Sequence, residues 1–331
     1  MIEHVLDLGN QLKKELETSN EFVVDPYKDL LIVGMGGSGV AGDVLKLVMN
    51  ETTPINVEVR KAYGIPKVTA DRRPKCLFIS YSGNTEETLE AVKDAIQYNL
   101  DWSVISSGGT LLDLALKHKK PYVKVPPGLQ PRAAFGLMTK AVMHFVSSDE
   151  SRKYLELCNQ AGDYINEVLA NQSENILLEH ALKISKEINT KSSVIYGGTP
   201  LTYLVAQRWK TQINENAKSK AFAGYMPEIH HNEILSWEGN KKDSKNNFQL
   251  LFLRSSNENP QVNKRFELTK EIIGDKVNIF EIDNISSANI ISNLFHLTLI
   301  GDLVSVYMAE NLNIDPYNIN AIEQLKKLLK G

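Results

Sequence analysis

Short apolar runs alternate with stretches of helical spacing along most of the chain. In the first half the apolar runs cover residues 30–33, 55–59, 76–80, 102–105 and 122–125. Helical stretches cover about 39–50, 85–99, 109–119 and 132–148. Strands that alternate with helices need crossover connections, so this pattern predicts a parallel sheet. The first and third runs are almost entirely apolar, which is typical of central strands covered on both faces.

The second half repeats the same alternation. Its apolar runs cover 193–196, 248–253 and 277–282, and its helical stretches cover 200–216, 260–273 and 286–311. Residues 32–38 and 194–199, about half the chain apart, both read as a strand, a Gly-Gly pair and a hydroxyl residue before a helix. Residues 150–190 show helical spacing without a strand-like run. We therefore predict an α/β protein of two doubly wound, flavodoxin-like parallel-sheet domains, 1–150 and 151–331.

The length of the chain agrees with two domains, and its charge limits the class of ligand. A chain of 331 residues is long enough for about two domains. Lys and Arg total 37 against 40 for Asp and Glu, a formal charge of −3, and the basic residues are scattered. We expect no nucleic-acid partner, because binding a polyanion needs a basic face or tail. A small anion needs only one local pocket and remains allowed.

Cysteine usage and the N-terminus predict a cytoplasmic protein. Cys76 and Cys158 are the only two cysteines, and the chain has no CxxC pair or Cys/His cluster. Neither a disulfide framework nor a metal site is expected. Glu3 and Asp7 interrupt the apolar positions of the first helical stretch, unlike the apolar region of a signal peptide. No run approaches the roughly 18 uninterrupted apolar residues of a membrane span, so we expect no membrane partner.

The first run leads directly into a glycine-rich loop, GMGGSGVAGD at residues 34–43. Glycines allow backbone N–H groups to face a ligand, the next helix offers its positive N-terminal end, and Ser38 adds a hydroxyl. This arrangement predicts a phosphate site. Gly34, Gly36 and Gly39 also form the GxGxxG dinucleotide pattern, with Glu58 near the position of a ribose-binding acid, so a nicotinamide dinucleotide is an alternative ligand.

The third run ends in a second candidate phosphate loop, SYSGNTEET at residues 80–88. Ser80, Ser82 and Thr85 could all donate to one phosphate, whereas helix capping alone would need one hydroxyl. A dinucleotide-binding unit has no use for this second loop, so a phosphorylated ligand is favoured over a dinucleotide. The phosphate-binding candidates are Gly37, Ser38, Ser80, Ser82 and Thr85.

The two loops, in this order, resemble the sugar isomerase (SIS) domain, a doubly wound module that binds phosphorylated sugars. With residues 131–134, 214–218 and 231–233, the resemblance extends over nearly the whole chain to the bifunctional phosphoglucose/phosphomannose isomerases of archaea and bacteria. It implies an enzyme that interconverts glucose 6-phosphate, and mannose 6-phosphate, with fructose 6-phosphate through a cis-enediol. It further implies no metal or cofactor, a small sugar phosphate as partner, and a homodimer with shared active sites.

Aldose–ketose isomerisation needs a carboxylate base, a group that opens the sugar ring and a cation beside the enediolate. Glu215 lies between two asparagines at the C-terminal end of a helical stretch, where the helix dipole disfavours a carboxylate. Without the resemblance it would read as an ordinary exposed helix acid; the resemblance makes it the base. His231 is implied to open the ring and to come from the other subunit, with His230 as the alternative.

Arg132 and Lys326 complete the implied site. Arg132 stands at the start of a helical stretch, where its charge opposes the helix dipole. The resemblance places it against the enediolate, whose negative charge a permanent cation stabilises. The C-terminal helical stretch resembles the helix that brings a lysine to the sugar ring oxygen, a position that Lys326 fits better than Lys327.

Two other functions use the same module. One is a sugar-phosphate sensor without turnover, for which the roughly 30 residues before the first strand are too few to supply a DNA-binding helix-turn-helix. The other is the isomerase half of glucosamine-6-phosphate synthase, which would be preceded by a glutaminase domain with an N-terminal cysteine. We expect isomerase activity. Acceptance of mannose 6-phosphate is left to assay, because about 1–2 kcal/mol of discrimination at C2 would decide it.

Overall fold

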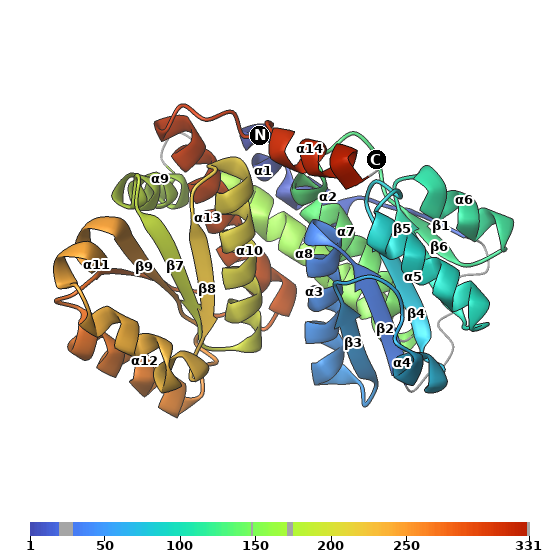
Figure 1. Cartoon of the computed structure of the whole chain (residues 1–331), viewed down its shortest axis with the longest axis horizontal. Helices are drawn as coiled ribbons and strands as arrows, with labels where there is room; N and C mark the ends of the chain where they lie inside the picture. Colours follow the sequence, from blue (N-terminus) through green and yellow to red (C-terminus); the bar gives the residue numbers. More distant parts are fainter. Residues whose placement is uncertain (20–28, 147, 171–174, 330–331) are drawn as a thin grey trace. The chain divides into compact units, whose positions relative to one another are not determined.

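The computed structural model describes residues 1–19, 29–146, 148–170 and 175–329. They divide into two compact units, each with its own sheet (Figure 1). The N-terminal unit is Leu6–Glu167 with Asn289–Ser292, and the C-terminal unit is Met1–Val5, Val168–Ala288 and Asn293–Gly331. The division lies near the end of a long helix, α8 (Ser148–Leu169), whereas the sequence placed it at residue 150. The reason is local: Lys140 of the N-terminal unit donates to Leu155 and Asn159 on this helix.

The N-terminal unit is built on a six-stranded sheet in the order β1-β6-β5-β4-β2-β3. Its strands are β1 (Glu17–Thr18), β2 (Asp29–Gly34), β3 (Asn56–Arg60), β4 (Lys75–Ser80), β5 (Trp102–Ser106) and β6 (Tyr122–Lys124). Only β1 pairs antiparallel; the other five strands are parallel. Read from β3, their order is that of a flavodoxin-like sheet, whose direction of winding reverses between β2 and β4. The predicted fold class is confirmed.

Helices cover both faces of this sheet (Figure 1). The helices of this unit are α2 (Leu8–Lys13), α3 (Gly36–Thr52), α4 (Lys67–Asp71), α5 (Glu86–Gln97), α6 (Gly109–Lys117), η1 (Pro131–Ala133), α7 (Phe135–Val142), η2 (Met143–Phe145) and α8 (Ser148–Leu169). Leu31 and Val33 of β2 join a fully buried core with α5 and α6. Ile32, on the opposite face, packs under Gly42 of α3. This alternation of apolar side chains to both faces explains the uninterrupted apolar run in β2.

The C-terminal unit repeats the parallel topology with four strands in place of five. Its sheet has the order β10-β9-β7-β8, all parallel. Its strands are β7 (Ser192–Gly197), β8 (Ala221–Tyr225), β9 (Phe248–Leu253) and β10 (Asn278–Ile282). Its helices are α1 (Ile2–Leu6), α9 (Ile176–Ile188), α10 (Pro200–Asn216), η4 (Glu228–His231), η5 (Glu233–Glu238), α11 (Lys241–Asn247), α12 (Pro260–Ile273), α13 (Ile290–Asn311) and α14 (Asn320–Leu329). Read from β8, the winding reverses between β7 and β9, as it does between β2 and β4.

One predicted element was wrong, and several short elements were not predicted. The stretch 132–148 is not one helix but η1, α7 and η2, because the Ala133 carbonyl accepts a hydrogen bond from the Gln11 side chain at 3.0 Å and the chain turns there. The edge strand β8 was not predicted. Its five residues include Gly224 and expose Phe222, so it lacks the apolar run that marks the central strands.

Helix α13 is long and apolar enough to cross a membrane by composition alone, with a mean hydropathy of 1.4. However, 83% of its most apolar window is buried inside the structure. Trp209 of α10 donates from Nε1 to the Leu297 carbonyl at 2.8 Å and lies against Gly301. These contacts are those of a core helix.

Candidate active site

The two hydroxyl-bearing loops meet where the winding of the N-terminal sheet reverses. Strands β2 and β4 are neighbours, and Gly34 pairs with Ile79 at their carboxyl ends. The Ser38 hydroxyl accepts a hydrogen bond from the backbone N–H of Tyr81 at 3.1 Å. This bond joins the first loop directly to the second. Ligands of doubly wound sheets bind at such a reversal, outside the carboxyl ends of the strands.

The second loop is ordered by its own hydroxyls. Ser80 Oγ lies 2.8 Å from Thr85 Oγ1 and accepts from the Gly83 N–H at 3.1 Å. Ser82 is exposed, and its Oγ accepts from the Asn84 N–H at 3.3 Å. Thr85 is the N-cap of α5, yet its side chain makes no capping bond to that helix. The arrangement leaves Ser80, Ser82 and Thr85 on one short turn at the positive end of α5.

Glycines in both loops allow approaches that a side chain would block. A Cβ on Gly37 would lie 3.0 Å from the Pro131 carbonyl oxygen and 3.6 Å from the Cα of Arg132. Gly83 has φ +71°, and a Cβ there would overlap the Gly108 carbonyl oxygen. The first of these contacts places η1, and with it Arg132, directly against the first phosphate loop.

Arg132 is only 5% exposed. Buried Gln11, on α2, fixes the chain just after it: Gln11 Nε2 donates to the Ala133 carbonyl at 3.0 Å, and Gln11 Oε1 accepts from the Gly136 N–H at 3.1 Å. Sequence reasoning missed Gln11, which reads as one polar position of an amphipathic helix. The result is a buried guanidinium on a fixed turn beside the two candidate phosphate loops.

The structure argues against a dinucleotide ligand, because the acidic residue expected to bind its ribose has another partner. Glu58, on β3, forms an ion pair with Arg72 at 2.7 Å near the surface. The residue beside the glycine loop is instead Lys61, whose Cε would be 3.0 Å from a Cβ on Gly39 and whose ammonium pairs with Asp43. Sequence reasoning also missed Lys61. A cation at this place suits phosphate rather than ribose hydroxyls.

Glu215 lies in the last turn of α10, half-buried, in the C-terminal unit. Its flanking asparagines hold the helix end: Asn214 donates to the Ser219 carbonyl and Asn216 to Ser305 Oγ, both at 2.9 Å. These two bonds fix the backbone that carries the Glu215 carboxylate.

The adjacent histidines have different surroundings. His230 is half-buried: its Nε2 lies 2.8 Å from Thr269 Oγ1, and its Nδ1 lies 3.1 Å from the Arg265 guanidinium. Burial, and then the charges of Arg265 and His231, lower the pKa of His230. His231 is exposed at the end of η4. His230 is therefore tied into the unit, while His231 faces outward.

Lys326 and Lys327 are both exposed on α14, as are Ile322, Leu325 and Leu328 on the same helix. The candidates thus fall into two groups. The structure brings Gly37, Ser38, Ser80, Ser82, Thr85 and Arg132 together in the N-terminal unit. Glu215, His231 and Lys326 belong to three separate elements of the C-terminal unit.

The corresponding reversal in the C-terminal unit is filled by protein. The N–H groups of Gly198 and Thr199 donate to Thr202 Oγ1 at 3.0 and 2.9 Å. Arg254, directly after β9, forms ion pairs with three carboxylates, and Lys270 pairs with two of them. Those carboxylates are Glu258, Glu267 and Glu281. Carboxylates outnumber cations here, so the cluster repels a phosphate dianion.

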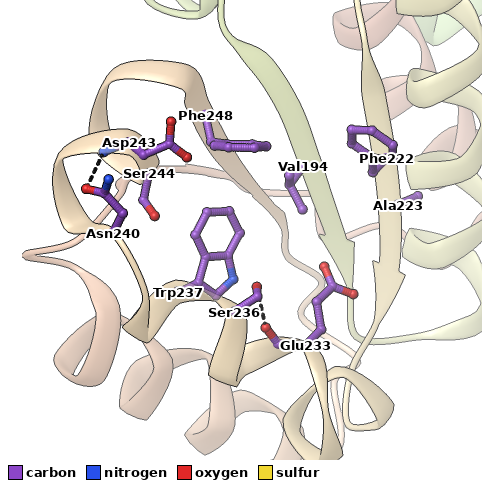
Figure 2. Close-up of a pocket in the computed structure, with 10 residues that line it drawn as sticks. All are labelled: Val194, Phe222, Ala223, Glu233, Ser236, Trp237, Asn240, Asp243, Ser244 and Phe248. Atoms are coloured by element: carbon purple, nitrogen blue, oxygen red, sulfur yellow. Dashed lines mark hydrogen bonds between the residues drawn. The ribbon is translucent and has the colours of Figure 1, made fainter.

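A pocket of about 530 Å³ also opens in the C-terminal unit, under the β8 edge (Figure 2). Aromatic rings line it, with Trp237 at its centre, together with the carboxylates of Glu233 and Asp243. Glu233 accepts a hydrogen bond from the Tyr196 hydroxyl at 2.6 Å. The ten residues that line the pocket include no lysine or arginine. It is therefore unsuited to a phosphate.

Comparison with known proteins agrees with this geometry. The model of the SIS domain matches residues 26–107, and that of the bacterial phospho-glucose isomerase C-terminal SIS domain matches 178–329. The bifunctional phosphoglucose/phosphomannose isomerase of Thermoplasma acidophilum is 32% identical over 98% of each chain. The chain belongs to the bifunctional phosphoglucose/phosphomannose isomerase family. The resemblance carried by its motifs is confirmed.

Two other proteins are similar to the chain, one in sequence and one in fold. The D-glucosamine-6-phosphate 4-epimerase of Sulfolobus acidocaldarius is 30% identical over 89% of this chain and 87% of its own. A hypothetical protein of Thermus thermophilus has the same fold, with a TM-score of 0.74 at 13% identity over 99% of this chain and 87% of its own. Within the isomerase family, the SIS match contains both phosphate loops, and the C-terminal match contains Glu215, His231 and Lys326.

Proposed function

We propose that this protein is an aldose–ketose isomerase that interconverts glucose 6-phosphate and mannose 6-phosphate with fructose 6-phosphate. One observation carries the proposal: the Ser38–Tyr81 hydrogen bond joins two hydroxyl-rich loops at the sheet reversal, where Gly37 lets Arg132 pack against them. A phosphate site beside a buried cation fits an enzyme that stabilises negative charge on a phosphorylated substrate. Family membership supplies the substrate class.

The substrate phosphate is held by Gly37, Ser38, Ser80, Ser82 and Thr85. The dianion accepts hydrogen bonds from loop N–H groups and hydroxyls at the N-terminal ends of α3 and α5, where the helix dipoles favour negative charge. Because these donors are neutral, the protein can bind a dianion while its formal net charge is −3.

The reaction begins with ring opening: the proton on O1 is removed, the C1–O5 bond breaks and O5 receives a proton. We assign these transfers to His231 and Lys326. The Glu215 carboxylate then takes the proton from C2 of the open aldose, giving a cis-enediolate whose charge Arg132 stabilises. The O2 proton then moves to O1, and returning the first proton to C1 as the C2=O2 bond forms produces the ketose. Exposed His231 is better placed than His230 to serve a site outside its own unit.

We further propose a cytoplasmic homodimer in which each active site receives His231 of the partner subunit. The cytoplasmic assignment is supported by two buried free thiols, Cys76 and Cys158. Burial raises the pKa of each to about 12, so neither is a ready thiolate.

The test is Glu215→Gln, which keeps the shape of the side chain but removes the base. We expect kcat to fall by at least about a thousandfold, at the upper end of what general-base catalysis contributes, with sugar-phosphate affinity nearly unchanged. The measurement is a coupled assay of fructose 6-phosphate formation from each aldose phosphate, alongside calorimetric binding. Glu271→Gln, an exposed position on α12, is the control and should keep wild-type kcat. Substantial activity in Glu215→Gln would disprove the assignment of the base.

The similarity to a D-glucosamine-6-phosphate 4-epimerase makes epimerisation the second candidate. The same preparation should be incubated with D-glucosamine 6-phosphate and its products separated by chromatography. Formation of a C4 epimer without fructose 6-phosphate formation from either aldose phosphate would replace the proposed function. Binding of sugar phosphates without any turnover would favour a sensor.

A further inference from the structure

Tyr81 lies between Ser80 and Ser82 in the second loop. It is 5% exposed, and its main chain connects two other loops. Its N–H donates to Ser38 Oγ at 3.1 Å, and its carbonyl accepts from Ser107 N and Oγ at 3.0 and 2.6 Å. These bonds fix the backbone of Tyr81 relative to the first phosphate loop and to the loop after β5.

The Tyr81 hydroxyl reaches a fourth segment. It donates to the Pro126 carbonyl at 2.9 Å and accepts from the Leu129 N–H at 3.0 Å. Residues 126–130 lead from β6 to η1, and we call them the arginine arm because Arg132 follows them. Burial raises the pKa of Tyr81, although the Leu129 N–H partly opposes this, so the hydroxyl stays protonated and can donate.

We propose that Tyr81 is a positioning residue for Arg132, acting by holding the arginine arm against the phosphate site. The inference rests on the proposed function, in which Arg132 stabilises the enediolate. Tyr81 fixes the chain just before Arg132, and Gln11 fixes it just after, through Ala133 and Gly136.

The arm needs such a contact. Gly128 has φ +102°, a conformation that only glycine adopts easily, and nothing among the described residues lies within 4 Å of where its Cβ would be. A cation stabilises developing charge only when it is held in place beforehand. One hydroxyl that bonds both ends of a short turn supplies this restraint, because losing it would leave a carbonyl and an N–H without their partner.

The variant Tyr81→Phe removes only the hydroxyl. We expect kcat to fall about tenfold, the scale of one lost hydrogen-bonding contact. KM should change by less than about twofold, because the backbone N–H that bonds Ser38 is retained. Tyr154→Phe is the matched control: Tyr154 is 5% exposed in the same unit, on α8, and its hydroxyl lies near Thr52 at the C-terminal end of α3. It should keep wild-type kcat.

A double-mutant cycle separates positioning from general damage. If Tyr81 acts through Arg132, adding Tyr81→Phe to an Arg132→Gln enzyme should cause no further loss of kcat. A tenfold loss in both backgrounds would overturn the proposal, as would an unchanged kcat in the single variant.

Hydrogen exchange tests the same contact without turnover. The Leu129 amide should exchange about tenfold faster in Tyr81→Phe than in the wild type and in Tyr154→Phe, because its acceptor is gone. Unchanged exchange would overturn the proposal. If the wild-type chain isomerises neither aldose phosphate, the proposed function fails, while the exchange result still decides whether Tyr81 holds the arm.

Discussion

His144 shows how one half-buried side chain couples stability to pH. It lies in η2, next to Lys140, whose ammonium donates to the Leu155 carbonyl at 3.0 Å and to Asn159 Oδ1 at 2.6 Å. Burial, and then the charge of Lys140, lower the pKa of His144 to about 4. The folded protein therefore accepts a proton on this ring much less readily than the unfolded chain, where an ordinary histidine has a pKa of about 6.5.

This difference predicts a loss of stability in acid. Because the folded pKa lies below the unfolded one, the contribution of His144 is fully present above about pH 6.5 and is lost as pH falls toward 4. Between pH 7 and pH 4.5, His144→Gln should lose about 2 kcal/mol less of its free energy of unfolding than the wild type. Urea unfolding at both pH values measures this. The exposed control His118→Gln should follow the wild type; equal acid losses in all three proteins would refute the prediction.

At the residue scale, the phosphate-binding candidates could be found from sequence, but the residues that support them could not. Ser80 ends an apolar strand and Ser38 lies four residues after one, so a local pattern marks both. Tyr81 and Gln11 act on main-chain atoms 45 or more positions away, at Pro126 and Ala133. No spacing in the sequence indicates such pairs, because a main-chain acceptor has no residue type.

Lys218 links the end of α10 to the segment that precedes α14. It has φ +52°, where glycine is favoured, but its ammonium donates to three carbonyls. They are those of Glu215 at 2.7 Å, Asp315 at 3.1 Å and Pro316 at 3.2 Å. A strained backbone kept for the sake of three hydrogen bonds indicates that this lysine fixes the turn that carries Glu215.

Lys218→Gly should separate stability from catalysis. Glycine relaxes the left-handed backbone, worth about 1 kcal/mol, and so offsets the lost hydrogen bonds. We expect a melting temperature close to wild type and a kcat lowered about tenfold, because the turn carrying the base is no longer tied down. Asn313→Gly is the matched control: Asn313 has φ +53° and is exposed. It should keep kcat, and an unchanged kcat in Lys218→Gly would show that Lys218 does not position Glu215.

At the element scale, prediction succeeded where local signals agreed. Helix α12 spans 260–273 as expected, because Asn259 caps it and Pro260 occupies its first position. Prediction failed where contacts with distant residues determine the secondary structure. The turn after η1 depends on Gln11, and β8 is a strand because it pairs with β7. Both causes lie far away in the sequence.

At the scale of the whole chain, one topology occurs twice, and in the C-terminal copy the reversal is filled by protein. The Gly-Gly pairs predicted the duplication. They could not predict that Arg254 would be neutralised by Glu258, Glu267 and Glu281, because these carboxylates come from three separate stretches of chain. A Cβ on Gly198 would lie 2.6 Å from Phe266, so that loop is also packed against protein.

The chain should therefore bind one sugar phosphate, not two. Calorimetric titration with 6-phosphogluconate, which has no aldehyde to isomerise, should give one site per chain. Ser38→Ala should weaken it about tenfold by removing a hydrogen bond to a charged group. Lys270→Met, in the closed reversal, should leave both stoichiometry and affinity unchanged. Two sites per chain in the wild type, with one lost in Lys270→Met, would show that the carboxylates around Arg254 give way to a phosphate and that both copies of the fold are binding modules.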